Sequence, residues 1–133
     1  MTDADRDKWD RKYADKSAIS IPEPDDWLME CVKEIPPGRA LDLACGLGQN
    51  ALLLSEWGWE VDAVDISMTG LEIPKEVSES LEYLVNWIRA DLDTWCPETQ
   101  YDLIICFRFL NWETVPRIVK EGLKPDGMFC YET

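Results

Sequence analysis

Apolar residues occur along this chain in short runs that alternate with helical stripes. The runs have the length of strands and predict five of them: Ala40–Ala44, Glu60–Val64, Tyr83–Ala90, Tyr101–Phe107 and Met128–Glu132. The stripes predict five helices: Asp5–Tyr13, Asp25 or Asp26 to Ile35, Asn50–Trp57, Ser67–Glu82 and Asn111–Leu123. The run YDLIICF is apolar almost without interruption, which is typical of a central strand in a parallel sheet.

Proline and glycine mark where these elements end. Pro36-Pro37-Gly38 ends the helix before the first strand, and Gly58 is predicted to cap the helix after it. Pro74 is predicted to interrupt the helix in which it lies, because proline removes a hydrogen-bond donor and clashes with the preceding turn. The sequence KPDG at Lys124–Gly127 predicts a turn before the last strand.

The order of these elements predicts the fold class. Alternating strands and helices indicate an α/β fold, a Rossmann-like open parallel sheet of about five strands with helices on both faces. Residues 90–100 leave room only for a loop or short turn between the third and fourth strands. Ligands of such sheets bind at the carboxyl ends of the strands. A length of 133 residues predicts a single domain, 1–133.

Charge narrows the range of partners. The net charge is −14, and residues 17–133 hold the whole excess, with 22 acidic against 8 basic side chains. Nucleic-acid binding needs clustered Lys and Arg, and an anionic membrane surface would repel this chain, so we expect neither partner. No apolar run reaches the roughly 18–20 residues that span a bilayer, and the N-terminus is charged rather than signal-like. We therefore expect a cytoplasmic protein.

The cysteine and histidine content limits the catalytic mechanisms and metal sites that this chain could have. The five cysteines are odd in number and form no CxxC pair, which favours reduced thiols. The chain has no histidine, so Ser-His and Cys-His catalysis and His-ligated metals are excluded. We expect no metal site, and we interpret Cys45 and Cys106 as small apolar side chains rather than nucleophiles.

The stretch Arg39–Ser67 predicts a β-α-β unit that binds a nucleotide. Gly46 and Gly48 begin a GxGxxA turn, and Asp65 follows Gly46 by 19 residues at the end of the second strand. This pattern suits both NAD and S-adenosylmethionine. The chain is too short for the second mononucleotide half that NAD needs. Asp42 before the turn would repel a pyrophosphate but suits the ammonium and sulfonium groups of S-adenosylmethionine.

Motifs along nearly the whole chain resemble those of class I S-adenosylmethionine-dependent methyltransferases. The resemblance is to the small-molecule branch that includes tellurite-resistance and thiol or chalcogen methyltransferases. Its first to fourth motifs and its post-helix turn with the fifth strand are similar to DLACGLGQN at Asp42–Asn50, VDIS at Val64–Ser67, ADL at Ala90–Leu92, YDLIICFRFL at Tyr101–Leu110 and LKPDGMFCYET at Leu123–Thr133. Trp9 and Tyr13 match an N-terminal W-x-x-x-Y element that folds over the cofactor in this family.

The resemblance implies a fold and a set of cofactor-binding residues. It implies the strand order 3-2-1-4-5, with residues 1–37 as an N-terminal helical lid and 38–133 as the Rossmann-like core. It assigns the ribose to Asp65, the adenine amino group to Asp91, with Asp93 as the alternative, and the methionine ammonium to Asp42, for which a brace of the loop is the alternative. The implied S-adenosylmethionine-binding set is Trp9, Tyr13, Asp42, Ala44, Cys45, Gly46, Gly48, Asn50, Asp65, Ile66, Asp91, Leu92 and Phe107.

The implied activity is methyl transfer to a small molecule. Soft nucleophiles such as thiol, selenium or tellurium species need no strong base, which fits a chain without histidine. The sequence singles out no catalytic residue. Tyr13 and Arg108 are the candidates, the latter because a cation at the mouth of the site would attract an anionic acceptor, and an ordinary surface cation is the alternative.

The chain departs from the family in two places. Asp126 stands where the family usually has glycine, and the chain stops at Thr133, before the usual C-terminal antiparallel hairpin. We expect the fifth strand to be an exposed apolar edge, which a homodimer would cover. The absent hairpin also raises an alternative function: an S-adenosylmethionine-binding module without its own acceptor pocket, acting as a sensor or as a subunit of a larger methyltransferase.

Overall fold

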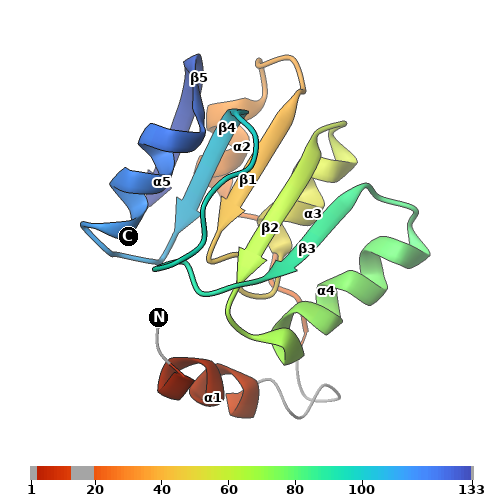
Figure 1. The fold of residues 1–133 in the computed structure, drawn as a ribbon. Helices are drawn as coiled ribbons and strands as arrows, with labels where there is room; N and C mark the ends of the chain where they lie inside the picture. Colours follow the sequence, from red (N-terminus) through yellow and green to blue (C-terminus); the bar gives the residue numbers. More distant parts are fainter. Residues whose placement is uncertain (1–2, 13–19, 133) are drawn as a thin grey trace.

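A computed structural model describes residues 3–12 and 20–132. Figure 1 shows a central sheet flanked by helices, with α1 beyond the lower ends of the strands. The helices and strands, in chain order, are α1 (Asp3–Lys12), α2 (Asp26–Val32), β1 (Arg39–Leu43), α3 (Gln49–Glu56), β2 (Glu60–Asp65), α4 (Met68–Ser80), β3 (Val85–Arg89), β4 (Tyr101–Phe107), α5 (Thr114–Gly122) and β5 (Leu123–Glu132).

The sheet has five strands in the order β3-β2-β1-β4-β5, and every neighbouring pair is parallel. This confirms the predicted fold class and strand order. As predicted, residues 90–100 form neither a helix nor a strand, so a loop alone joins β3 to β4. The strand order reverses at β1, because β2 and β3 lie on one side of it and β4 and β5 on the other.

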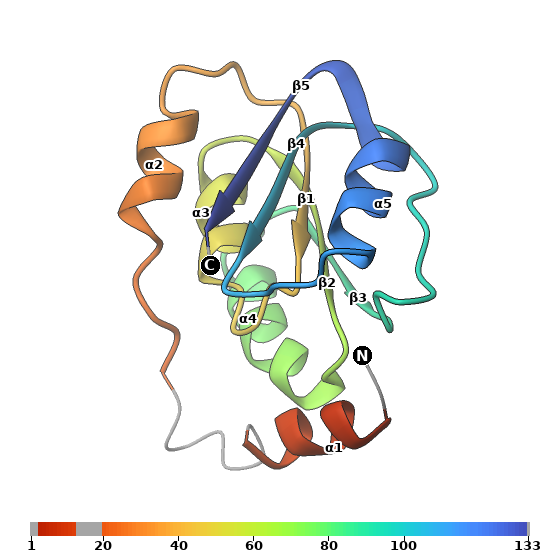
Figure 2. The same ribbon diagram turned by 90° about the vertical axis from the view of Figure 1, so that its left-hand side faces the viewer.

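Two apolar clusters cover opposite faces of the sheet. Figure 2 shows α2 and α3 on one side and α5 on the other. Side chains of α2, α3 and α4, such as Leu28, Leu54 and Leu71, pack on one face, and Val115 and Ile118 of α5 pack on the other. Ile104 and Ile105 point to different clusters because successive strand residues alternate in direction. A sheet buried on both faces explains why β4 is almost continuously apolar.

The predicted interruption at Pro74 was wrong, because α4 continues through this residue. Pro74 is buried, and a Cβ built at Gly48 would lie 2.8 Å from its Cβ atom. The ring is therefore packed against the glycine turn, and this burial compensates for the lost backbone hydrogen bond. Ser67 begins the helix as predicted, since its Oγ accepts the Gly70 N–H at 3.0 Å.

The predicted turn at Lys124–Gly127 was also wrong as a boundary, since β5 runs through it from Leu123. Leu123 pairs with Tyr101, but Met128 already pairs with Leu103. The strand thus accommodates the extra KPDG residues in a register shift. Pro125 is tolerated there because an edge strand leaves one side of its backbone unpaired.

Several element ends differ from the expected ones. α5 begins at Thr114, because the Asn111 Oδ1 accepts the N–H groups of Glu113 and Thr114 and ends the preceding loop. α2 ends at Val32 rather than Ile35, and Trp27 is 53% exposed rather than part of the apolar stripe. Gly58, with φ 96°, is the left-handed residue directly after the α3 C-cap, as its predicted capping role requires.

β5 is an edge strand with apolar side chains in solvent. Met128 and Phe129 are 39% and 38% exposed, which confirms the expected apolar edge. What covers it stays a prediction. Among the described residues, no helix is long and apolar enough to cross a membrane.

Candidate ligand site at the carboxyl ends of β1 and β4

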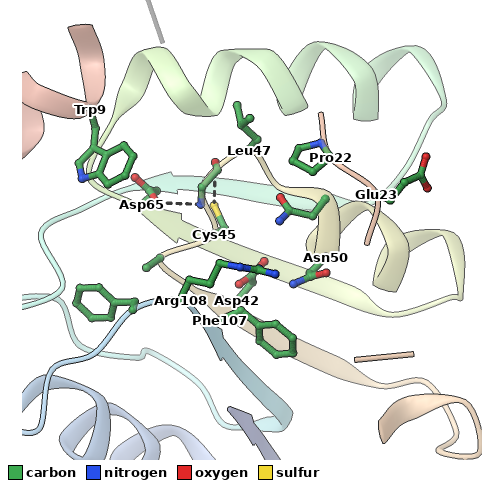
Figure 3. Close-up of a pocket in the computed structure, with 14 residues that line it drawn as sticks. Trp9, Pro22, Glu23, Asp42, Cys45, Leu47, Asn50, Asp65, Phe107 and Arg108 are labelled. Atoms are coloured by element: carbon green, nitrogen blue, oxygen red, sulfur yellow. Dashed lines mark hydrogen bonds between the residues drawn. The ribbon is translucent and has the colours of Figure 1, made fainter. Parts of the chain in front are cut away.

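A pocket of about 480 Å³ opens where the strand order reverses. A volume of this size is typical of small-molecule sites. Figure 3 shows its walls, formed by the glycine turn, the ends of β1, β2 and β4, and side chains of α1 and α3. The predicted site residues that line it are Trp9, Asp42, Ala44, Cys45, Gly46, Asn50, Asp65, Phe107 and Arg108.

Two residues at the edge of the pocket have unusual backbone conformations. Ala44 and Arg108 directly follow β1 and β4, and both adopt left-handed conformations with φ of 55° and 60°. Such a conformation costs a non-glycine residue roughly 1–2 kcal/mol. Strain of this kind collects at functional sites, where surrounding contacts maintain it. The two adjacent strands therefore turn away sharply at their carboxyl ends and leave the pocket between them.

The two glycines of the turn have different roles. Gly46 has φ 58°, and a Cβ built on it would meet no atom within 4 Å, so its backbone faces open space. Gly48 has φ 77°, and its Cβ would lie 2.7 Å from Trp87 and 2.8 Å from Pro74. Gly46 therefore leaves room for a ligand close to the backbone, whereas Gly48 allows the turn to pack on the core.

Asp42 is the most unusual charged group in the pocket. Its side chain is on β1, only 3% exposed, and its Oδ2 atom has no hydrogen-bond partner. Burial raises the pKa of this carboxyl well above its usual range, and the nearby acids Asp65 and Asp25 raise it further. A buried acceptor without a donor favours a ligand that brings one, and a cation would also relieve the repulsion between the acids.

Asp65 connects β2 to the glycine turn. Its two carboxylate oxygens accept the N–H groups of Gly46 at 3.0 Å and Ser67 at 3.1 Å. Burial raises the pKa of Asp65, and these backbone hydrogen bonds oppose the shift by stabilising the charged form. The side chain therefore holds Gly46 in place while it lines the pocket.

The helix α1 brings Trp9 to the pocket. Its Asp10 side chain accepts hydrogen bonds from the Ser67 Oγ and, at 3.4 Å, from the Thr69 N–H at the start of α4. Trp9 lines the pocket beside Asp65, and its role over a bound cofactor stays a prediction. Tyr13, the other aromatic residue of that element, lies outside the described residues.

The two cysteines near the pocket are poorly suited to act as nucleophiles. Cys45 and Cys106 are both buried. Burial raises the pKa of Cys45 well above its usual range and that of Cys106 to about 12, and the charge of Asp42 adds to both shifts. A thiol with a raised pKa is inert at neutral pH.

Four predicted residues do not line the pocket. Gly48 is in the turn but packs on the core, and Ile66 and Leu92 are buried, with exposures of 5% and 0%. Asp91 accepts the Asp93 N–H at 2.9 Å in the loop after β3, and Asp93 in turn accepts the Thr114 hydroxyl at 2.9 Å. The roles assigned to Asp91 and Leu92, and the alternative Asp93, stay predictions.

Sequence reasoning missed some pocket-lining residues. They are Pro22, Glu23, Leu47, Gln49 and Phe109. Leu47 and Gln49 lie within the glycine motif, and Phe109 follows β4, so their neighbours could have indicated them. Pro22 and Glu23 are in a segment without helix or strand and carry no such signal. The described residues contain no cluster of three or more His, Cys, Asp or Glu that could hold a metal ion.

Comparison with known proteins identifies the family. The family model "Tellurite resistance protein TehB" matches residues 5–128, which is nearly the whole chain. The chain belongs to the TehB family. A curated TehB-family relative, the probable S-adenosyl-L-methionine-dependent methyltransferase TehB of Haemophilus influenzae, is 32% identical over 96 residues, which cover 70% of this chain and 34% of the relative.

Solved structures agree with membership of the TehB family. The crystal structure of TehB from Haemophilus influenzae is similar with a TM-score of 0.72 and 28% identity, covering 95% of this chain and 44% of that one. Coclaurine N-methyltransferase bound to N-methylheliamine and SAH is similar with a TM-score of 0.70 and 27% identity, covering 78% of this chain and 33% of that one. The chain thus spans about a third of the curated TehB relative.

Proposed function

We propose that this TehB-family protein binds S-adenosylmethionine in the pocket between β1 and β4 and transfers its methyl group to a small soft nucleophile. The acceptor class is a thiol or a selenium or tellurium species. The family of the chain and the named methyltransferases among its relatives support the donor. The buried Asp42 carboxyl, whose Oδ2 has no partner, carries the proposal, because it favours a cationic hydrogen-bond donor in the pocket.

The residues present fit this cofactor. The ammonium of its methionine moiety would satisfy the free Oδ2 of Asp42. Asp65 lies at the end of β2, where a carboxylate accepts hydrogen bonds from ribose hydroxyls. The open side of Gly46 lets a ligand approach the backbone, and Trp9 lies beside Asp65 as an aromatic wall of the pocket.

Catalysis in this site rests on positioning. When bound, S-adenosylmethionine supplies an electrophilic methyl group, which the lone pair of an acceptor takes as the bond to sulfur breaks and S-adenosylhomocysteine (SAH) leaves. The chain contributes apolar walls at Phe107 and Phe109 that exclude water, and acids that hold the donor in one orientation. The chain has no histidine to act as a general base, so an acceptor that is already nucleophilic suits it best.

Calorimetry with SAH and a turnover assay test this proposal together. We expect SAH to bind the wild type and to bind Asp42→Asn more weakly. Incubation with methyl-labelled S-adenosylmethionine and a panel of thiols, selenite and tellurite should then yield methylated products, detected by mass spectrometry of solution and headspace.

Each outcome discriminates between functions. A thermal shift with NAD and none with SAH would overturn the choice of cofactor. Tight SAH binding with no product from any acceptor would instead favour the alternative of a binding module or subunit. Products from an alcohol or amine panel alone would refute the soft-nucleophile class.

A further inference from the structure

An ion pair and a pair of hydrogen bonds, which share Asp25, join three parts of the chain beside the pocket. The Arg108 guanidinium donates two hydrogen bonds to Asp25, one from Nη1 to Oδ2 at 3.0 Å and one from Nη2 to Oδ1. Asn50 forms a reciprocal pair with the same residue: its Nδ2 donates to the Asp25 Oδ2 at 2.9 Å, and its Oδ1 accepts the Asp25 N–H at 3.0 Å. Both carboxylate oxygens of Asp25 are therefore engaged by side chains from distant parts of the chain.

Each of the three residues comes from a different part of the fold. Asp25 is the N-cap of α2, Asn50 is in the first turn of α3, and Arg108 directly follows β4. Figure 3 shows the Arg108 side chain extended across the pocket toward Asn50. The left-handed conformation of Arg108, with φ 60°, turns the chain sharply at the end of β4 and is part of this arrangement.

The ion pair lies next to a pocket wall with no regular structure. Residues 20–25 form neither helix nor strand, yet Pro22 and Glu23 line the pocket. A segment without the regular backbone hydrogen bonds of a helix or strand depends on side-chain contacts for its position. Asp25 supplies such contacts at the end of this segment.

We propose that Arg108 and Asp25 are positioning residues that hold the Pro22–Glu23 wall of the pocket. In this role the Arg108 guanidinium binds Asp25 and does not bind an anionic methyl acceptor. The inference deepens the proposed function and rests on it for its ligand-binding readout. It replaces the earlier candidate role of Arg108 as a cation that attracts the acceptor.

The burial of Asp25 and the direction of its pKa shift support a stable ion pair with Arg108. The Asp25 side chain is 11% exposed and that of Arg108 is 57% exposed, so the carboxylate depends on its partners more than the guanidinium does. The hydrogen bonds from Arg108 lower the pKa of Asp25, against the opposing effect of burial. A two-pronged arginine contact is also geometrically specific, and lysine cannot reproduce it.

The test compares Asp25→Asn, Arg108→Gln, Arg108→Lys and the double variant Asp25→Asn/Arg108→Gln. Lys33→Gln is the matched control, because Lys33 forms an exposed ion pair with Glu30 on the same helix segment. We expect each single change to neutral residues to weaken SAH binding about tenfold and the double variant to lose no more than either. Arg108→Lys should lie between these variants and the wild type, and Lys33→Gln should bind as the wild type does.

Amide hydrogen exchange supplies a readout that needs no ligand. The Asp25 N–H is bonded to Asn50, so its exchange should become faster in both single variants and stay unchanged in Lys33→Gln. Unchanged exchange in the variants would overturn the proposal. If the wild type fails to bind SAH, the proposed function fails, while the exchange experiment still decides the positioning role.

Selenite distinguishes positioning from acceptor binding by the sign of one effect. If Arg108 were an anion receptor, Asp25→Asn would free it and strengthen selenite binding to the SAH complex, and Arg108→Gln would weaken it. The positioning role predicts that neither variant binds selenite more tightly than the wild type. Stronger selenite binding by Asp25→Asn, or additive losses of SAH affinity in the double variant, would refute the proposal.

Discussion

Replacing Asp42 by asparagine should stabilise the ligand-free protein and weaken its cofactor binding. The carboxyl is 3% exposed, with one oxygen unpartnered. A buried polar group without a partner costs about 1–3 kcal/mol, and a charged one costs more. Asparagine keeps the shape of the side chain and removes the charge. The gain comes from removing the charge, since asparagine is itself a buried polar group; at about 4 °C per kcal/mol for a chain of this length, relief of about 1 kcal/mol would raise the Tm at pH 8 by roughly 4 °C.

The effect should depend on pH with a defined sign. Burial raises the pKa of Asp42 well above its ordinary value of 3.8, so the folded state holds this proton over a pH range in which the unfolded chain has lost it. The stability of the wild type relative to the variant therefore falls as pH rises from about 4 through the raised pKa. The stabilisation by Asp42→Asn should be smallest near pH 4 and should increase as the pH rises toward 8.

Thermal melts followed by circular dichroism at several pH values measure both effects, with and without SAH. Asp126→Asn is the matched control, since it changes the net charge equally at an exposed position. Loss of a charged hydrogen bond of about 1.5–3 kcal/mol should weaken SAH binding roughly 10- to 100-fold. A variant that melts below the wild type at pH 8, or a difference independent of pH, would refute this account of Asp42.

Three further experiments test other parts of the site. Gly46→Ala should cost roughly 1–2 kcal/mol from backbone strain, and calorimetry should show lost SAH binding, whereas Gly48→Ala should destabilise more because its Cβ meets Trp87 and Pro74. Equal melting temperatures for the two would contradict this division. Thiol-reactive dye at pH 8 should label the exposed Cys96 first, and the buried Cys45, Cys106 and Cys130, whose pKa values burial raises, much later. Rapid labelling of Cys106 in the folded protein would oppose its role as an apolar side chain. Asp10→Ala removes the contact of α1 with Ser67 and should weaken SAH binding several-fold with little change in Tm, and unaltered affinity would show that α1 does not depend on this contact.

Element types followed well from local patterns, and boundaries followed less well. YDLIICF predicted β4 to the residue, because a nearly continuous apolar run of this length suits a strand that is buried on both faces of a parallel sheet. Pro74 and KPDG were misjudged because both are local signals that tertiary packing overrides. The proline ring is buried against Gly48, and the edge position of β5 tolerates a register shift.

The sequence by itself determined the fold class, the β-α-β unit and the kind of ligand that the acids and glycines suit. These follow from properties of neighbouring residues: periodicity, turn chemistry, and a carboxylate at a strand end. It also placed Asp42, Gly46 and Asp65 together, because parallel strands bring their carboxyl ends to one edge.

Only the tertiary structure decided which of the predicted residues face the pocket. It separated Gly46 from Gly48 by what surrounds each, left the Asp42 Oδ2 without a partner, and joined Asp25 to Arg108 across 83 positions of sequence. The physical reason is that burial, orphaned hydrogen-bond groups and long-range ion pairs depend on which segments the packed sheet brings into contact. No local pattern contains that information.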